Sequence, residues 1–133
     1  MKRVLATCLT VVAAVLLCTQ GEAESPNQVG PFMRAKLTHS QRLLEGITLE
    51  DFDLIAKHSQ DLSLLSQEAS WRVLQTPEYL QHSLEFRRAA DALTEAARKK
   101  NLDSAALGYM DLTMKCVNCH KYVRDVRTAG TKR

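Results

Sequence analysis

The stretch FDLIAKHSQDLSLLSQEASWRV, residues 52–73, decides the fold that we expect for this chain. Its apolar and small side chains recur at alternating steps of three and four residues, which places them on one face of an α-helix. They are Phe52, Ile55, Ser59, Leu62, Ser66, Ala69 and Val73. Thr48 is the expected N-cap, and Trp71 is expected to fill the bundle core. No segment alternates apolar and polar residues convincingly, so the stretch predicts a helix in the seam of an all-helical bundle.

The segment before this stretch has the same periodicity. A helix is expected from about Pro31 to Glu45 and is expected to end at Gly46, because glycine commonly follows the last helical turn. Its inner face would carry Met33, Leu37, Ser40 and Leu44. His39 lies about 200° around the helix from Leu37, so we expect His39 at the surface.

The second half of the chain predicts a third helix. Thr76 is its N-cap and Pro77 its first residue, and Asn101 closes it. The inner face would carry Tyr79, Ser83, Phe86, Ala90, Leu93 and Ala97. His58 and His82 flank the apolar seams of their helices and are expected to be partly exposed.

The last helix is expected to start near Leu102 or Asp103 and to end before Ala129 and Gly130. Its inner face would carry Tyr109, Thr113, Cys116, His120 and Val123. The connections after the first and third helices are short, so neighbouring helices should run antiparallel. The sequence therefore predicts an all-α, antiparallel, up-down-up-down four-helix bundle.

The N-terminal residues have the features of a secretory signal peptide. Basic residues precede an apolar stretch at 4–18, and the small residues Gly21 and Ala23 stand where cleavage is expected. A membrane anchor would need ~20 apolar residues, which this stretch does not reach. We therefore expect cleavage after Ala23, which removes residues 1–23, exports the protein to the periplasm and leaves residues 24–133 as a single domain with no integral membrane segment.

The cysteines point to a cofactor rather than to disulfides. Cys8 and Cys18 leave with the signal peptide, while Cys116 and Cys119 precede His120 in the sequence C-V-N-C-H. On a helix, positions i, i+3 and i+4 share one face, so both thiols and the imidazole would point the same way. This is the motif of covalent c-type haem attachment, in which the thiols bond the two vinyl groups and the histidine binds iron.

Three other interpretations fit C-V-N-C-H less well. A structural zinc site needs four ligands, whereas the sequence has no second cysteine pair and its other histidines are isolated. A dithiol redox motif usually lies near a βαβ pattern, which is lacking. A chance occurrence would leave a haem-free helical binding module. The export signal and the helical seam favour one covalent haem c with its iron.

Residues in the C-terminal half carry a resemblance to a known family. They are Leu93, Ala96, Ala97, Leu102, Asp103, Cys116, Cys119, His120 and Arg124. Their spacing resembles that of cytochrome c prime, the class II c-type cytochromes. The resemblance implies a four-helix bundle with haem near the C-terminal helix and His120 as the proximal iron ligand. It also implies that Arg124 lies near the proximal haem face or a propionate. Arg34 and Lys36 are further candidates for propionate contacts, although Lys36 suits a solvated face equally well.

The iron ligand opposite His120 decides between two functions. Histidine and methionine together fill the iron coordination and suit electron transfer, whereas iron with histidine alone can bind nitric oxide or carbon monoxide. Met33 lies ~20 Å and His120 ~27 Å from the shared end of their antiparallel helices, and the lean of helical side chains brings the two closer. We therefore predict Met33 as the candidate distal ligand and single-electron transfer, without enzymatic activity, as the function. A five-coordinate gas-binding cytochrome c prime is the alternative.

The charges limit the choice of partners. Removal of residues 1–23 takes away Lys2, Arg3 and Glu22 and lowers the net charge from +3 to +2, a balance that disfavours a nucleic-acid-binding protein. Positive residues near the C-terminus would steer an acidic redox partner. The alternative is that they are there because positive side chains interact favourably with the helix dipole at a C-terminal end. These residues are Lys121, Arg124, Arg127, Lys132 and Arg133. Homodimerisation is common in the resembling family, but no stripe in the sequence identifies an interface.

Overall fold

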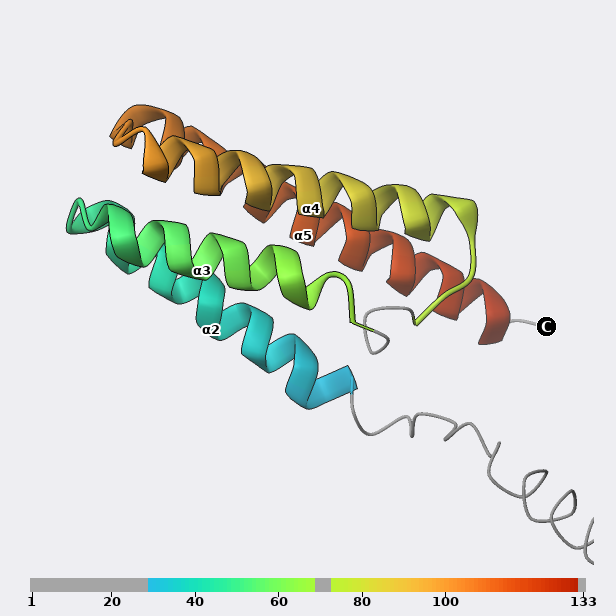
Figure 1. Ribbon diagram of the computed structural model, residues 1–133. Coiled ribbons are helices and arrows are strands. Elements are labelled where there is room, and N and C mark those ends of the chain that lie inside the picture. Colours follow the sequence, from blue (N-terminus) through green and yellow to red (C-terminus); the bar gives the residue numbers. More distant parts are fainter. Residues whose placement is uncertain (1–28, 69–72, 132–133) are drawn as a thin grey trace, which may run out of the picture.

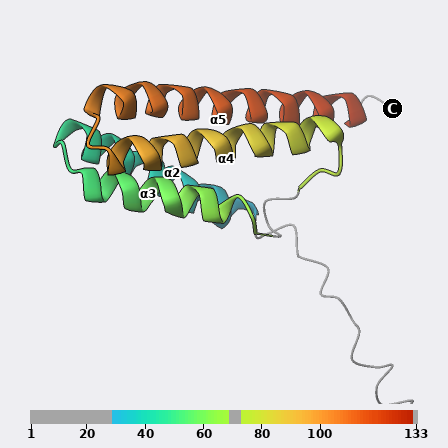
Figure 2. The ribbon, with the colours of Figure 1, turned by 45° about the horizontal axis from the view of Figure 1, so that its top comes forward.

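The computed structural model describes residues 29–68 and 73–131, which form four α-helices (Figure 1). They are α2 (Val29–Thr48), α3 (Phe52–Leu65), α4 (Pro77–Arg98) and α5 (Leu102–Thr131). Consecutive helices run antiparallel, and these ranges contain no strand (Figure 2). The predicted all-α, up-down-up-down bundle is confirmed. The predicted signal peptide, Ala69 and Trp71 lie outside the described residues.

Gly46 lies inside α2, although the sequence predicts the helix to end there. A Cβ atom at this position would come within 2.9 Å of Ile55 Cγ1 and 3.3 Å of the Asp51 carbonyl oxygen. Glycine is therefore needed because α2 approaches the start of α3 closely, not because the helix stops. The helix ends at Thr48, and Glu50 turns the chain with a φ of 55°.

Asp51, not Thr48, is the N-cap of α3. The Asp51 side chain accepts a hydrogen bond of 2.9 Å from the backbone N–H of Leu54. The prediction of Thr48 was wrong because this residue still belongs to α2, where its hydroxyl donates to the Glu45 carbonyl at 2.9 Å. The negative charge of this carboxylate also interacts favourably with the positive N-terminal end of the helix dipole.

α3 ends at Leu65, whereas the sequence predicts that the helix continues to Val73. The C-cap is Ser66, whose hydroxyl donates to the Ser63 carbonyl at 2.6 Å and accepts a bond of 2.9 Å from Arg87 Nε. A serine side chain that bonds to nearby backbone competes with helix continuation. The apolar periodicity therefore extends beyond the helix that it predicts.

The two ends of α4 follow the sequence closely. Thr76 caps α4 and Pro77 is its first residue, as predicted, and the Thr76 hydroxyl accepts a first-turn N–H at 3.2 Å. Asn101 closes α4 as predicted, because its backbone N–H donates to the Ala96 carbonyl at 3.0 Å. Its side chain also accepts a bond of 2.9 Å from the Ser104 N–H at the start of α5. The chain turns at Lys100, which has a φ of 53°.

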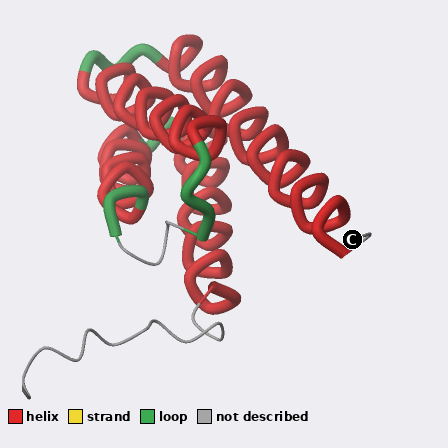
Figure 3. Tube along the Cα trace, turned by 90° about the vertical axis from the view of Figure 1, so that its right-hand side faces the viewer, coloured by secondary structure: helices red, strands yellow, loops and turns green. Residues whose placement is uncertain are grey.

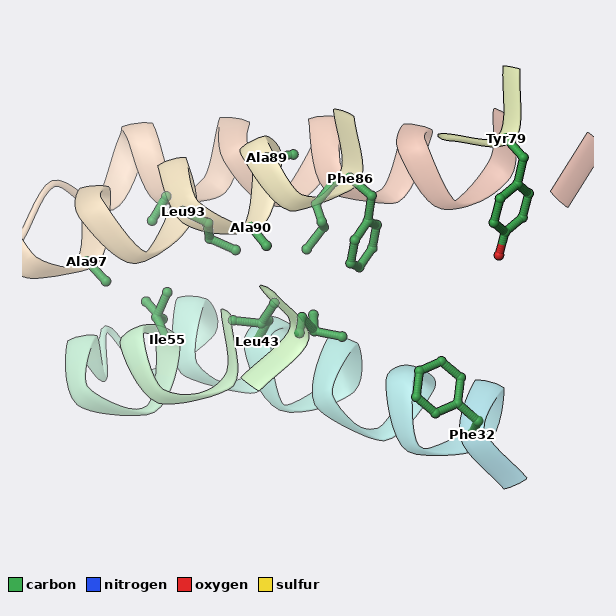
Figure 4. Close-up of a cluster of buried hydrophobic side chains, with 12 residues drawn as sticks. Phe32, Leu43, Ile55, Tyr79, Phe86, Ala89, Ala90, Leu93 and Ala97 are labelled. Atoms are coloured by element: carbon green, nitrogen blue, oxygen red, sulfur yellow. The ribbon is translucent and has the colours of Figure 1, made fainter. Parts of the chain in front are cut away.

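The core lies where α4 faces α2 and α3. Every predicted inner residue of α4 is buried: Tyr79, Ser83, Phe86, Ala90, Leu93 and Ala97. Figure 4 shows Ala90 and Leu93 facing Leu43 of α2 and Ile55 of α3. Ser59 and Thr94 share a buried hydrogen bond of 2.7 Å between α3 and α4, so the polar groups in this seam are satisfied.

The buried stripe of α2 differs from the predicted one. Its buried residues are Phe32, Leu43 and Gly46. Leu37 and Leu44, which were expected to face inward, are 55% and 49% exposed. The reason is that α2 packs against α3 far more than against α5. The line that contains Met33, Leu37 and Ser40 therefore borders a groove toward α5 instead of the core.

α5 is the longest helix, with 30 residues, and it runs to Thr131 rather than ending before Ala129 and Gly130. Only Ala105 and Leu112 of this helix are buried. Toward its C-terminal end α5 leans away from α2 (Figure 3), while it stays packed on α4. This divergence opens the bundle on the side where C-V-N-C-H lies.

Candidate functional site

Cys116, Cys119 and His120 lie on one side of α5, as their spacing predicts. Both cysteines are partly buried and pack against the hydrophobic core. His120 and Thr113, which were expected on the inner face, are exposed. Since α2 covers little of α5, these side chains border an opening rather than the packed core.

A groove between α2 and α5 reaches both thiols and the imidazole. Its two hollows share a set of lining residues: Met33, Lys36, Phe86, Cys116 and His120. The larger hollow is completed mainly by the apolar side chains Leu37, Leu62, Tyr109, Leu112 and Val117. Its volume of about 330 Å³ falls in the range of ~300–1,000 Å³ that cofactor sites occupy. The groove can therefore hold a flat, largely apolar group beside the motif.

Met33 lies on the α2 wall of this groove, across from Cys116 and His120 on α5. The helix lengths predict Met33 and His120 at similar heights in the bundle, and both residues border both hollows. The Met33 thioether accepts a hydrogen bond of 3.8 Å from Lys36 Nζ. A thioether sulfur, a soft donor atom, thus lies in the groove, and it already has a polar contact.

Lys36 lies inside the groove rather than on a solvated face. Its Nζ atom stands 4.7 Å from the centroid of the Phe86 ring, within cation–π range. Burial lowers the pKa of Lys36 from 10.5 to about 8, although charges on Cys116 and Cys119 act in the opposite direction. The helical spacing could have revealed this position, because Lys36 is one turn after buried Phe32.

The electrostatics of the motif favour neutral groups. Burial raises the pKa of both Cys116 and Cys119, and the nearby Lys36 amine partly offsets this effect. Partial shielding of the imidazole from water also lowers the pKa of His120, and the positive charges of Lys36 and Arg124 lower it further. At neutral pH the thiols are therefore protonated, and the imidazole is in the neutral form that binds metals.

The two predicted propionate contacts differ in position. Arg124 is exposed one turn after His120, and its charge acts on that imidazole. Arg34 is exposed and does not line the groove. Lys115 and Arg127 line the smaller hollow instead, a position that the sequence did not predict. Cations suited to a bound carboxylate therefore gather mainly on α5.

Tyr122 ties the divergent part of α5 to the start of α4. Its hydroxyl shares a hydrogen bond of 2.6 Å with the Thr76 hydroxyl, and its ring centroid lies 5.4 Å from that of His82. Tyr122 is also packed against the hydrophobic core. These contacts hold the helix segment that carries the motif on α4 while its other side stays open toward α2.

A second cluster lies between α2 and α3. His39, which was expected at the surface, is partly buried and shares a hydrogen bond of 2.9 Å with His58 through the two Nδ1 atoms. Oδ2 of Asp61 is 3.4 Å from His39 Nδ1 and 3.7 Å from His58 Nδ1. The sequence did not reveal this cluster because its members come from two helices whose relative rotation depends on packing.

Comparison with protein-family models, curated proteins and solved structures finds no match to this chain. The resemblance to the cytochrome c prime family therefore rests on the sequence motifs and stays a prediction. Across residues 29–68 and 73–131, no helix combines the length and the apolar character needed to cross a bilayer.

Proposed function

We propose that the protein is an exported c-type cytochrome, similar to cytochrome c prime, that carries single electrons in the periplasm. The observation that carries this proposal is the opening of Cys116, Cys119 and His120 onto an apolar groove with Met33 on its opposite wall. Two thiols and an imidazole on one helix face are the donor set of covalent haem attachment. Bound haem supplies reversible one-electron chemistry at its iron.

The residues around the groove fit such a cofactor. Cys116 and Cys119 would hold it through thioether bonds, and neutral His120 would bind the iron from the α5 side. The apolar walls of the larger hollow suit the porphyrin ring, and Arg124 would balance a propionate. With the ring held between α2 and α5, water would be kept from most of its surface.

Met33 would complete the iron coordination in the electron carrier. Its place on the α2 wall supports this role. A gas-binding protein with an open iron position is the second candidate. The observation that favours it is the 3.8 Å hydrogen bond from Lys36 to the Met33 sulfur. A sulfur atom that accepts this bond is less available to the iron.

The C-terminal part of α5 supports an acidic redox partner. Lys121, Arg124 and Arg127 are exposed there, close to the motif residues of the groove. A positive patch beside the cofactor would attract a negatively charged protein over long range and raise the rate of encounter. Binding to such a partner should weaken steeply as salt is added.

The attachment is tested on protein exported from a host that matures c-type cytochromes. After acid–acetone extraction and denaturing electrophoresis, haem should remain with the wild-type chain and with a Leu64→Ala control, which changes an exposed side chain of α3. It should be absent from Cys116→Ala with Cys119→Ala. Haem that extracts freely from the wild-type protein contradicts the proposal. Absorption spectra of both redox states, with and without carbon monoxide, then separate the electron carrier from the gas-binding protein.

A further inference from the structure

We infer that His39, His58 and Asp61 form a second site, which binds a divalent transition ion of the Zn²⁺ class. The site joins α2 to α3 on a part of the bundle that does not border the groove, and it does not depend on the proposed function. His58 and Asp61 are three residues apart on one helix, so both face His39 on the other. Metal sites in helical bundles are commonly built from such facing helices.

The distances between the donor atoms suit a tetrahedral ion. The three atoms are separated by 2.9, 3.4 and 3.7 Å, whereas ligands around Zn²⁺ with bonds of ~2.0–2.1 Å lie ~3.3–3.4 Å apart. A point equidistant from the three donors is about 2 Å from each, which is the bond length itself. A widening of the His39–His58 contact by a few tenths of an ångström would complete the fit.

The surroundings leave the site open to an ion. The three side chains are between 14% and 29% exposed, so an ion can enter while most of the site stays shielded. Two cations among the described residues oppose an ion: Lys57 bonds the same Asp61 oxygen at 2.8 Å, and Arg42 acts on His58. Lys57 is exposed enough to move away. Burial lowers the pKa of His58, so its imidazole is neutral and ready to bind.

Three protein ligands leave one position for water or an outside ligand. Two imidazoles and one carboxylate suit Zn²⁺, and Cu²⁺ would bind more tightly by the general order of affinities. Mg²⁺ and Ca²⁺ prefer oxygen ligands and should not compete. The two imidazole nitrogens therefore select transition ions over Mg²⁺ and Ca²⁺, which have the same charge.

The test is equilibrium dialysis of the mature full-length protein against Zn²⁺, with bound zinc measured by atomic absorption. Any thiols not consumed by haem are first blocked with iodoacetamide, so zinc held at Cys116 and Cys119 is not counted. One zinc per chain is expected. His39→Ala, His58→Ala and Asp61→Asn should each weaken zinc binding by ~100-fold or more. Removing a hydrogen-bond partner of a metal ligand already lowers metal affinity by ~10–100-fold, and these changes remove the ligand itself. His82→Ala is the matched control and should bind as the wild type does.

Asp61→Asn keeps the size of the side chain, so it tests the site even if an alanine variant folds poorly. Far-ultraviolet circular dichroism checks the fold of each variant. Absence of bound zinc in the wild type, or zinc that persists unchanged in His39→Ala and Asp61→Asn, would show that the cluster is a hydrogen-bond network only. Failure of haem attachment would leave this result unaffected.

Discussion

Replacing Lys36 by methionine should stabilise the haem-free bundle. Burial in the groove lowers the pKa of Lys36 from 10.5 to about 8. One pKa unit corresponds to ~1.4 kcal/mol, so the folded state disfavours the protonated amine by roughly 3 kcal/mol. Methionine has a similar length and no charge, and it can keep the contact with Phe86. The free energy of unfolding at pH 7 should therefore rise by up to ~3 kcal/mol, less the lost cation–π attraction.

The pH dependence gives the effect a second signature. Between pH 8 and 10.5 the unfolded chain holds a proton on Lys36 that the folded chain has lost. Folding stability therefore rises with pH in this window, because the unfolded state binds more protons. The penalty is fully present below pH 8 and has gone above pH 10.5. Lys36→Met should remove this contribution, so the advantage of the variant should shrink toward pH 10.

The measurement is urea unfolding of haem-free wild-type protein and Lys36→Met, followed by circular dichroism under reducing conditions. The raised pKa values of Cys116 and Cys119 give both proteins an opposite slope, so the difference between the two curves is compared. Lys121→Met, which replaces an exposed lysine of α5, is the control and should change stability little. A Lys36→Met variant that is no more stable at pH 7, or whose gain stays constant to pH 10, would contradict the burial of this amine.

Three further changes test the site and the fold. In haem-loaded protein, Met33→Ala should turn a low-spin form that binds carbon monoxide poorly into a high-spin form that binds it readily, and should lower the reduction potential; a wild type that takes up the gas at once would argue against Met33 ligation. Cys116→Ala with Cys119→Ala should lower the midpoint of thermal unfolding and weaken the near-ultraviolet circular dichroism bands, since only two residues of α5 are buried without a cofactor. An unchanged midpoint would show that haem is not part of the core. Gly46→Ala should destabilise by up to ~2 kcal/mol, because overpacking against Ile55 costs ~1–3 kcal/mol and helix propensity returns ~1 kcal/mol. Gly130→Ala is the control: its new Cβ atom has nothing within 4 Å, so it should not destabilise the protein.

The helices follow from the sequence because their signals are local. The spacing of apolar residues on α4 predicts its whole buried face, from Tyr79 to Ala97. Thr76 and Pro77 mark its start, since a cap acts on N–H groups only three residues away. Helix ends were harder to predict. Glycine and asparagine are residue types common at helix ends. The close approach of α2 to α3 is what requires Gly46, and the Asn101 side chain caps the first turn of α5.

The candidate site divides in the same way. The sequence by itself determined that two thiols and an imidazole share one face of the last helix, because spacing of three and four residues on a helix fixes their directions. Only the tertiary structure decided what that face meets. The lean of α5 away from α2 made a groove, placed Lys36 inside it and left His120 exposed. The same packing turned His39 toward α3, since the rotation of one helix against another depends on all the side chains between them.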